Sequence, residues 1–220
     1  MDSLNTKQPQ RLKYGETELN YLKNACPKLG AVIDKMGFLE RKIVPDLFVA
    51  LVSSVVAQQI SGKAAETIWR RFESLIGEVS PENILRADPL EMQKCGMSHK
   101  KVGYIVGIAT AATDGTVDFK ALSKMQDSEV IEKLSSLKGV GVWTAEMLLI
   151  FSLERKDVLS WGDFAIKKGL MKLHGLESIS KAEFEEFRKL YSPYNSIASL
   201  YLWEVYFASG RIAGIELLLL

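Results

Sequence analysis

The chain has 220 residues, of which 47% are hydrophobic and 25% are charged. This length and composition fit one globular unit, or two closely packed lobes with a substantial core, and they exclude a disordered chain or a coiled coil. The formal net charge is only +1. A nucleic-acid partner would therefore have to meet a local basic surface made by sets such as Arg70-Arg71, His99-Lys100-Lys101 and Lys167-Lys168, although a solvated helix face is the simpler interpretation of each set.

The sequence contains few cysteines and histidines that could bind a metal ion. Cys26 and Cys95 lie far apart and form no C-x-x-C pair, which fits a reducing compartment and excludes a cysteine-ligated zinc or iron-sulfur site. The histidines are His99 and His174, too few for a histidine metal site. We therefore expect no catalytic metal.

Apolar residues recur at helical spacing along almost the whole chain, and the breaks carry helix-capping chemistry. The polar segment 1–15 has neither a signal-peptide nor a membrane-anchor pattern and is expected to begin as a flexible arm. Pro27 can open a helix, and Asp46, Ser61 and Ser98 can each cap the apolar segment that follows it. No segment gives a convincing strand pattern.

A glycine-rich turn separates two apolar segments in the middle of the chain. The first, residues 127–139, carries an apolar stripe and ends at Gly139, where a left-handed helix cap belongs. The second, residues 142–153, begins immediately afterwards. A polar loop then leads to a further helix that begins near Asp163.

The last part of the chain continues the helical pattern. Ser180 and Glu183 form a capping-box pattern, and the segment after Pro193 predicts a mostly apolar helix. The C-terminal "IELLLL" is too short to span a bilayer and is expected to pack on the protein or to fray. The sequence thus predicts a compact all-α fold of roughly a dozen short helices without a membrane partner.

The hairpin "LKGVGVWTA" favours a phosphate site. Gly139 and Gly141 permit positive φ and leave no side chain to hold another backbone away. The next helix presents unpaired N–H groups at Val142 and Thr144, where the peptide dipoles favour an anion. An ordinary helix-helix connection remains open, because G-x-G alone is a weak signal and glycine often ends helices.

The hairpin and the loop after it carry a family resemblance. "LSSLKGVGVWTAEMLL" resembles the hairpin of the helix-hairpin-helix DNA glycosylase superfamily, and "KDVLSWGDFAIKKGL" resembles its loop and catalytic aspartate, here Asp163. The loop departs from the superfamily pattern, since Trp161-Gly162 stands where a proline is often found before the aspartate. This departure makes the conformation of the loop less predictable.

Three further segments extend the resemblance over most of residues 46–207. "FVALVSSVVAQQISGKAAETIWRRF", "DPLEMQKCGMSHKKVGYIVGIA" and "YSPYNSIASLYLWEV" occur in the order expected of the alkylpurine branch, the 3-methyladenine DNA glycosylase II type. The resemblance is to the shorter form of this branch, without the N-terminal β-rich domain that some bacterial members carry.

The resemblance implies an architecture and a reaction. Residues 48–155 would form one helical lobe ending in the hairpin, and residues 1–47 would pack with residues 156–220 as the other, with Asp163 at the cleft. A damaged base, an alkylated purine such as 3-methyladenine, would be turned out of duplex DNA and cut from its sugar. Asp163 would oppose the positive charge that develops on the sugar. From the residues alone, a simple N-cap is the favoured role of Asp163, and the resemblance is what favours catalysis.

Tryptophans are the predicted substrate contacts. Trp143 stands where bifunctional relatives carry the lysine that forms a Schiff base, so no lyase step is expected. The resemblance implies that Trp143 faces the base, with Trp203 as its counterpart and Trp161 as a further candidate, because aromatic faces attract a cationic alkylpurine. Core packing remains open for Trp143 and Trp203.

The loop "QQISG" is the predicted wedge. In this branch a residue of that loop enters the minor groove, and Ile60 and Ser61 are the candidates. Gln58 and Gln59 are left with two roles, a hydrogen bond to the opposite base or one to the local backbone. His99 fits either a phosphate contact or plain surface.

The resemblance also implies the partners. No cofactor is expected, although family members often hold Na⁺ or K⁺ against hairpin carbonyls, here those of Leu137 and Gly139. Damaged double-stranded DNA is the expected partner of a monomer, in the cytoplasm of a prokaryote or the nucleus of a eukaryote. A noncatalytic hairpin module, a helical protein-interaction domain and a glycosylase for another damaged base remain alternatives.

Overall fold

The computed structural model describes residues 10–208, and this part of the chain is all-α. Within that range no strand forms, and the single β-type pairing is an isolated bridge between Arg11 and Lys42. The expectations for the first nine residues and for "IELLLL" lie outside the described residues. No described helix combines the length and the apolar character that crossing a bilayer requires.

The helices follow one another through short connections, so the predicted all-α class is confirmed. In chain order they are α1 Glu16–Ala25, α2 Pro27–Met36, α3 Leu47–Ala57, α4 Gly62–Ile76, α5 Pro81–Arg86, α6 Pro89–Lys94, α7 His99–Thr113, the 3₁₀ turn η1 Ala121–Lys124, α8 Asp127–Ser135, α9 Val142–Phe151, α10 Phe164–His174, α11 Lys181–Tyr191 and α12 Asn195–Phe207.

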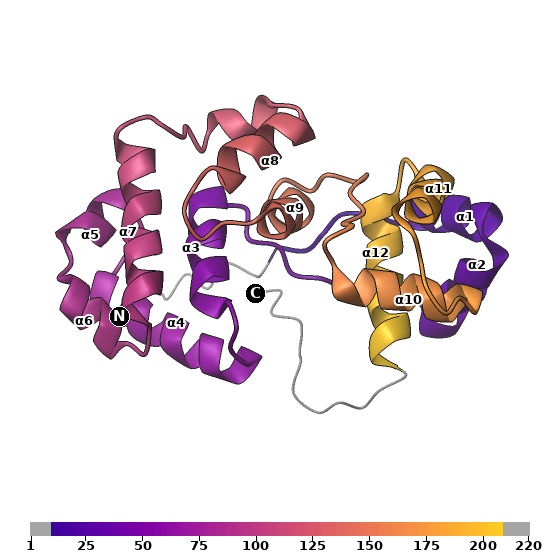
Figure 1. Cartoon of the computed structure of the whole chain (residues 1–220), viewed down its shortest axis with the longest axis horizontal. Coiled ribbons are helices and arrows are strands. Elements are labelled where there is room, and N and C mark those ends of the chain that lie inside the picture. The colour runs from indigo at the N-terminus through magenta and orange to yellow at the C-terminus, as the bar shows by residue number, and fades with distance from the viewer. Residues whose placement is uncertain (1–9, 209–220) are drawn as a thin grey trace, which may run out of the picture.

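Two groups of helices lie on either side of α9 (Figure 1). In one group α7 packs against α3, α5 and α6, and in the other α12 packs against α10, α11, α1 and α2. Helix α9 contacts α8 and α3 on the side of the first group. Helices from the beginning and from the end of the described range thus meet in the second group. The exact lobe boundaries after residues 47 and 155 stay predictions.

Local capping explains where most of these helices begin. The side chains of Asp46, Ser61 and Ser98 each accept a hydrogen bond from the backbone N–H three residues later. Ser180 and Glu183 form the reciprocal capping box. These four sequence predictions are confirmed.

The helix before the hairpin ends earlier than the sequence predicts. Helix α8 stops at Ser135, and a separate turn follows in which Val140 N–H donates to the carbonyl of Leu137 at 3.1 Å. Gly139 has a φ of +87° in that turn. It therefore supplies the left-handed residue of the hairpin rather than the cap of α8.

The crossing of α10 over α12 places the start of α10 against the core. At Gly169 an added Cβ would lie 2.3 Å from the carbonyl oxygen of Leu202, so the two backbones touch where no side chain fits. Helix α12 is buried on nearly every side. A buried helix thus packs against α10, at whose N-terminus Asp163 lies.

Candidate active site

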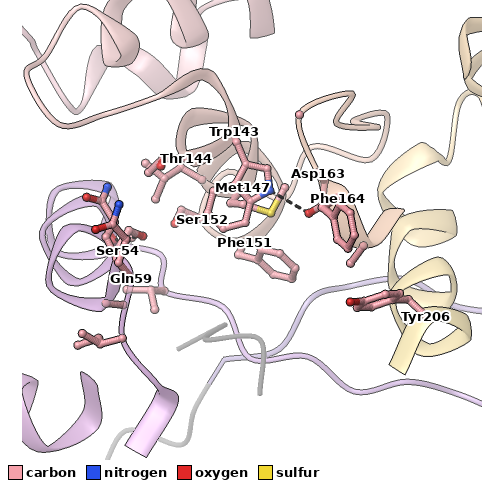
Figure 2. A pocket seen from close by; sticks show the side chains of 18 of the residues that line it. Ser54, Gln59, Trp143, Thr144, Met147, Phe151, Ser152, Asp163, Phe164 and Tyr206 are labelled. Carbon is pink, nitrogen blue, oxygen red and sulfur yellow. Dashed lines mark hydrogen bonds between the residues drawn. The ribbon is translucent and has the colours of Figure 1, made fainter. Parts of the chain in front are cut away.

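A cavity of about 550 Å³ opens between the end of α3, helix α9 and the start of α10 (Figure 2). This volume falls in the range of small-molecule sites, roughly 300–1,000 Å³. Trp143, Met147 and Phe151 line it from α9, and Phe164 lines it from α10. Asp163 is the single carboxyl group among the described residues of its wall. An acid in a mostly apolar cavity is a typical arrangement for chemistry on a charged intermediate.

Asp163 is both a helix cap and a cavity residue. Its Oδ1 accepts the backbone N–H of Ile166 at 2.8 Å, while its Oδ2 accepts the indole N–H of Trp143 at 2.8 Å and that of Trp203 at 3.2 Å. Only 4% of the residue is exposed. Because a carboxylate offers about four acceptor positions, these three donors leave roughly one for a water or a substrate atom. The two roles left open by the sequence are therefore compatible.

The loop before Asp163 is held by a buried polar network. The hydroxyl of Ser160 donates to the carboxyl of Glu146 on α9, and the guanidinium of Arg188 donates to the carbonyl of Leu159 at 2.7 Å. Burial raises the pKa of Glu146, the Ser160 hydrogen bond and Arg188 oppose this rise, and the nearby charge of Asp163 adds to it. These contacts fix the loop conformation that the missing proline left unpredicted.

Of the three predicted tryptophans, Trp143 is the one that reaches the cavity. It is 41% exposed and lines the wall next to Asp163 (Figure 2). Trp203 is 1% exposed and stacks on Phe151 with ring centroids 5.8 Å apart. The expectation that Trp203 faces the base is therefore corrected, because it lies in the core and contacts the site only through its indole N–H.

Trp161 also lies away from the cavity wall. Its ring packs edge-on against Phe184 at 5.1 Å, and the ammonium of Lys167 lies 4.7 Å from the ring centroid. The expectation that it binds substrate is corrected as well. Its packing anchors the turn before Asp163 instead.

The hairpin glycines differ in what they permit. At Gly139 an added Cβ would lie 2.2 Å from the ring of Tyr104, so both space and positive φ require glycine. Gly141 has a φ of −96° and open space around its Cβ position, so the expected positive φ is wrong there. Val142 is 53% exposed beside it, whereas Thr144 is 6% exposed and belongs to the cavity wall.

The predicted wedge loop turns at Gln59. This residue is exposed and has a φ of +60°, a strained backbone conformation for a residue other than glycine. Ile60 is half-buried and lines the cavity, and the hydroxyl of Ser61 caps α4. Gln58 instead points inward, and its amide donates to the carbonyl of Gly139 at 2.9 Å. Of the two candidates for the wedge, Ile60 is thus close to the cavity and Ser61 is engaged in capping.

The basic set on α7 is split by the fold. His99 and Lys100 are exposed, and a ring nitrogen of His99 lies 3.2 Å from the amide of Gln93. Lys101 turns inward and donates to the carbonyls of Val56 at 2.7 Å and Gln58 at 2.6 Å. It is therefore removed from the predicted basic surface.

The two hairpin carbonyls at which a monovalent cation is expected each accept one hydrogen bond, which leaves one lone pair on each oxygen, so the cation site stays a prediction. The carbonyl of Leu137 accepts the N–H of Val140, and that of Gly139 accepts the amide of Gln58. Across the described residues, no group of three or more histidine, cysteine, aspartate or glutamate side chains is placed to hold a metal ion. We derive no step through a cation.

Several cavity residues were missed by the sequence reasoning. Met147 and Phe151 follow Trp143 at intervals of four residues on α9, and Phe164 directly follows Asp163. Helical periodicity counted from Trp143 would have placed the first two on its face. The 60% exposure of Phe164 and the approach of Tyr206 from α12 could not be foreseen, since both depend on how α10 crosses α12.

Most of the chain matches a known protein family. Residues 52–193 match the family model described as HhH-GPD superfamily base excision DNA repair protein. The chain belongs to this superfamily. The matched residues include the wedge loop, the hairpin and Asp163.

Two relatives with known names show that this HhH-GPD protein belongs to the alkylpurine branch. It is 36% identical over 159 residues to DNA-3-methyladenine glycosylase 1 of Schizosaccharomyces pombe, covering 70% of each chain. It is 35% identical over 171 residues to DNA-3-methyladenine glycosylase of Saccharomyces cerevisiae, covering 73% of this chain but 58% of that relative.

Solved structures agree with the fold of the HhH-GPD chain. The crystal structure of DNA-3-methyladenine glycosidase from Bacillus halodurans matches with a TM-score of 0.80 at 34% identity, covering 91% of this chain and 94% of the other. That of the Schizosaccharomyces pombe 3-methyladenine DNA glycosylase in complex with abasic DNA matches with a TM-score of 0.76 at 30% identity, covering 86% and 96%.

Proposed function

We propose that this protein is a DNA glycosylase that takes an alkylated purine, such as 3-methyladenine, out of duplex DNA and hydrolyses its bond to the sugar. One observation carries the proposal. The carboxylate of Asp163 lies in an apolar cavity beside the exposed ring of Trp143, so one site combines an anion for the sugar with an aromatic face for the base. The family membership of the chain supports the same reaction class.

The chemistry follows from the charges in the cavity. As the bond between base and sugar breaks, the electron pair leaves with the base and the sugar becomes positively charged. Asp163 stabilises that charge and orients a water molecule toward the sugar, and the apolar wall strengthens the interaction. An alkylated purine is already cationic, so it departs without a proton from the protein. Trp143 binds it by stacking and by cation–π attraction.

We further propose that the reaction is purely hydrolytic. A Schiff base requires a lysine amine at the sugar. Among the described residues that line the cavity there is no lysine, and Trp143 stands at the position where the resemblance would put one. The product is then an abasic site in an intact strand.

DNA binding would use the hairpin and the loop around Gln59. The open surface at Gly141 and the start of α9 would receive a phosphate, and the exposed Gln59 with its neighbour Ile60 would enter the space that the base leaves. We propose that the protein acts as a monomer on damaged duplex DNA. The Gln59 side chain thereby joins the earlier candidates for the wedge.

Base release tests this function directly. Duplexes containing 3-methyladenine or 7-methylguanine, both cationic, are incubated with the protein beside duplexes containing the neutral base hypoxanthine, and free base is quantified. We expect release of the cationic bases and much slower release of hypoxanthine. Tight DNA binding without release of any base would instead support the noncatalytic hairpin module.

A further inference from the structure

Lys101 closes the end of helix α3. Its ammonium group donates to the carbonyls of Val56 and Gln58, at 2.7 and 2.6 Å, where a helix has carbonyls without partners in the next turn. A cation is favoured at this end of a helix. The residue is half-buried, and burial lowers the pKa of its ammonium group. Lys101 therefore gives up part of its hydration to hold the backbone that leads into the wedge loop.

Gln58 joins the wedge loop to the hairpin. Its amide donates to the carbonyl of Gly139 at 2.9 Å, across 81 residues of sequence. Gly139 packs on the ring of Tyr104, which leaves no space for a Cβ. Lys101 and Tyr104 are three residues apart on α7, so they lie on the same face of that helix. One face of α7 thus supports both DNA-facing segments.

The strain at Gln59 is explained by these contacts. A non-glycine residue stays at positive φ only where its surroundings fix it. The carbonyl of Gln58 is held by Lys101 and its amide by Gly139, while Ser61 caps α4 on the other side. With both neighbours fixed, the loop presents the Gln59 side chain at its tip.

We propose that Lys101 and Gln58 are positioning residues that latch the wedge loop to the hairpin, so that loop insertion and phosphate binding occur together. The inference rests on the proposed glycosylase function and deepens it. Gln58 serves the protein in this arrangement, and it does not read the base opposite the lesion.

The hydrogen bonds of Lys101 and Gln58, here called the latch, should affect paired and unpaired lesions differently, which a general role in stability would not do. A paired lesion must be extruded while the duplex is held, whereas a lesion in a single-nucleotide bulge is unpaired from the start. Breaking the latch should therefore slow excision from a paired site far more than excision from a bulge. Since Gln58 reads no base, the loss should be the same opposite thymine and opposite cytosine.

The test uses single-turnover excision of 7-methylguanine by the full chain with enzyme in excess. Lys101→Met removes the donors and keeps the length of the side chain, Gln58→Met removes the amide, and Lys101→Arg restores two donors. Lys100→Met is the matched control, because it removes a neighbouring exposed charge, 5.7 Å from the centroid of the Tyr104 ring, and leaves the hydrogen bonds of Lys101 and Gln58 in place.

We expect either methionine variant of the latch to lower the ratio of paired to bulged rates by about tenfold, the scale of one lost hydrogen-bonded contact in a partly buried unit. In the double variant the ratio should fall no further than in the single variant with the larger loss, because both changes break one unit. Lys101→Arg should recover most of the ratio, and Lys100→Met should leave it unchanged.

Three results would overturn the latch. They are an unchanged ratio in both methionine variants, losses that multiply in the double variant, and a Gln58→Met loss that depends on the opposite base. Folding is checked by thermal unfolding, and Gln58→Met keeps the test open should Lys101→Met fail to fold. Absence of excision by the wild-type protein would instead refute the proposed function, so the two failures are distinguishable.

Discussion

Replacing Asp163 by asparagine separates its structural role from its chemical one. All three partners of the carboxylate are donors: the N–H of Ile166 and the indole N–H groups of Trp143 and Trp203. An amide has one acceptor oxygen and one donor nitrogen. In either orientation its NH₂ group faces at least one N–H donor, so isosteric replacement still breaks a hydrogen bond.

The cost can be worked out for each orientation. With the oxygen toward the indoles, α10 loses its N-cap bond to Ile166, which contributes about 0.5–2 kcal/mol. With the oxygen toward Ile166, the buried indole N–H of Trp203 has no acceptor, which costs about 1–3 kcal/mol. Removal of a buried charge offsets part of either cost. We expect the free energy of unfolding to fall by about 1–2 kcal/mol, or Tm by roughly 2–8 °C.

The effect on excision should be much larger. Loss of a preorganised group that stabilises transition-state charge typically lowers the rate by about 10²–10³-fold. The assay is single-turnover release of 7-methylguanine at 25 °C, with circular dichroism melting and binding to an abasic duplex on the same preparation. Asp157→Asn is the matched control, because Asp157 lies in the same loop but binds Asn195 and Ser192 outside the cavity.

Different results would refute the chemical role and the structural role of Asp163. Wild-type excision by a pure Asp163→Asn preparation would remove this residue from the chemistry. An unchanged or raised Tm would show that the three N–H donors find other acceptors. An equal loss of excision in Asp157→Asn would mean that loop disturbance, and not the missing charge, slows the reaction.

Three further predictions concern the site. Borohydride added during the reaction should trap no protein–DNA adduct, because Trp143 supplies no amine; an abundant adduct that survives controls for nonspecific amine reaction would contradict a purely hydrolytic reaction. Gly141→Lys should weaken duplex binding at fixed salt, because its side chain obstructs the phosphate, and should leave the protein folded. Gly139→Ala should instead destabilise the folded protein by about 1–3 kcal/mol. Equal chemical-denaturation midpoints for the two variants would refute this contrast. The raised pKa of Glu146 means that its neutral form favours folding, so this contribution is full below pH 4.5 and is lost as pH rises through the folded pKa. Glu146→Gln keeps an acceptor for Ser160 and should match wild type in acid but exceed it in urea midpoint at pH 7; a lower midpoint at pH 7 would refute the sign.

Local chemistry explains why so much could be predicted. A cap such as Asp46 or Ser61 bonds to an N–H three residues away, so the sequence itself contains both partners. The positive φ of Gly139 and the position of Asp163 at the start of α10 are local in the same sense. The order of the family segments added the reaction class, which no periodicity contains.

The sequence by itself determined the all-α class, most helix starts, the hairpin and the candidate aspartate, because each depends on residues within a turn or two of one another. Tertiary structure alone decided that Trp203, 40 residues from Asp163, supports its carboxylate from the core, and that Gln58 bonds to Gly139 instead of facing outward. These contacts form only when separate helices pack. Their geometry depends on how the helices cross, on how closely the backbones approach and on which polar groups become buried, and no segment encodes these alone.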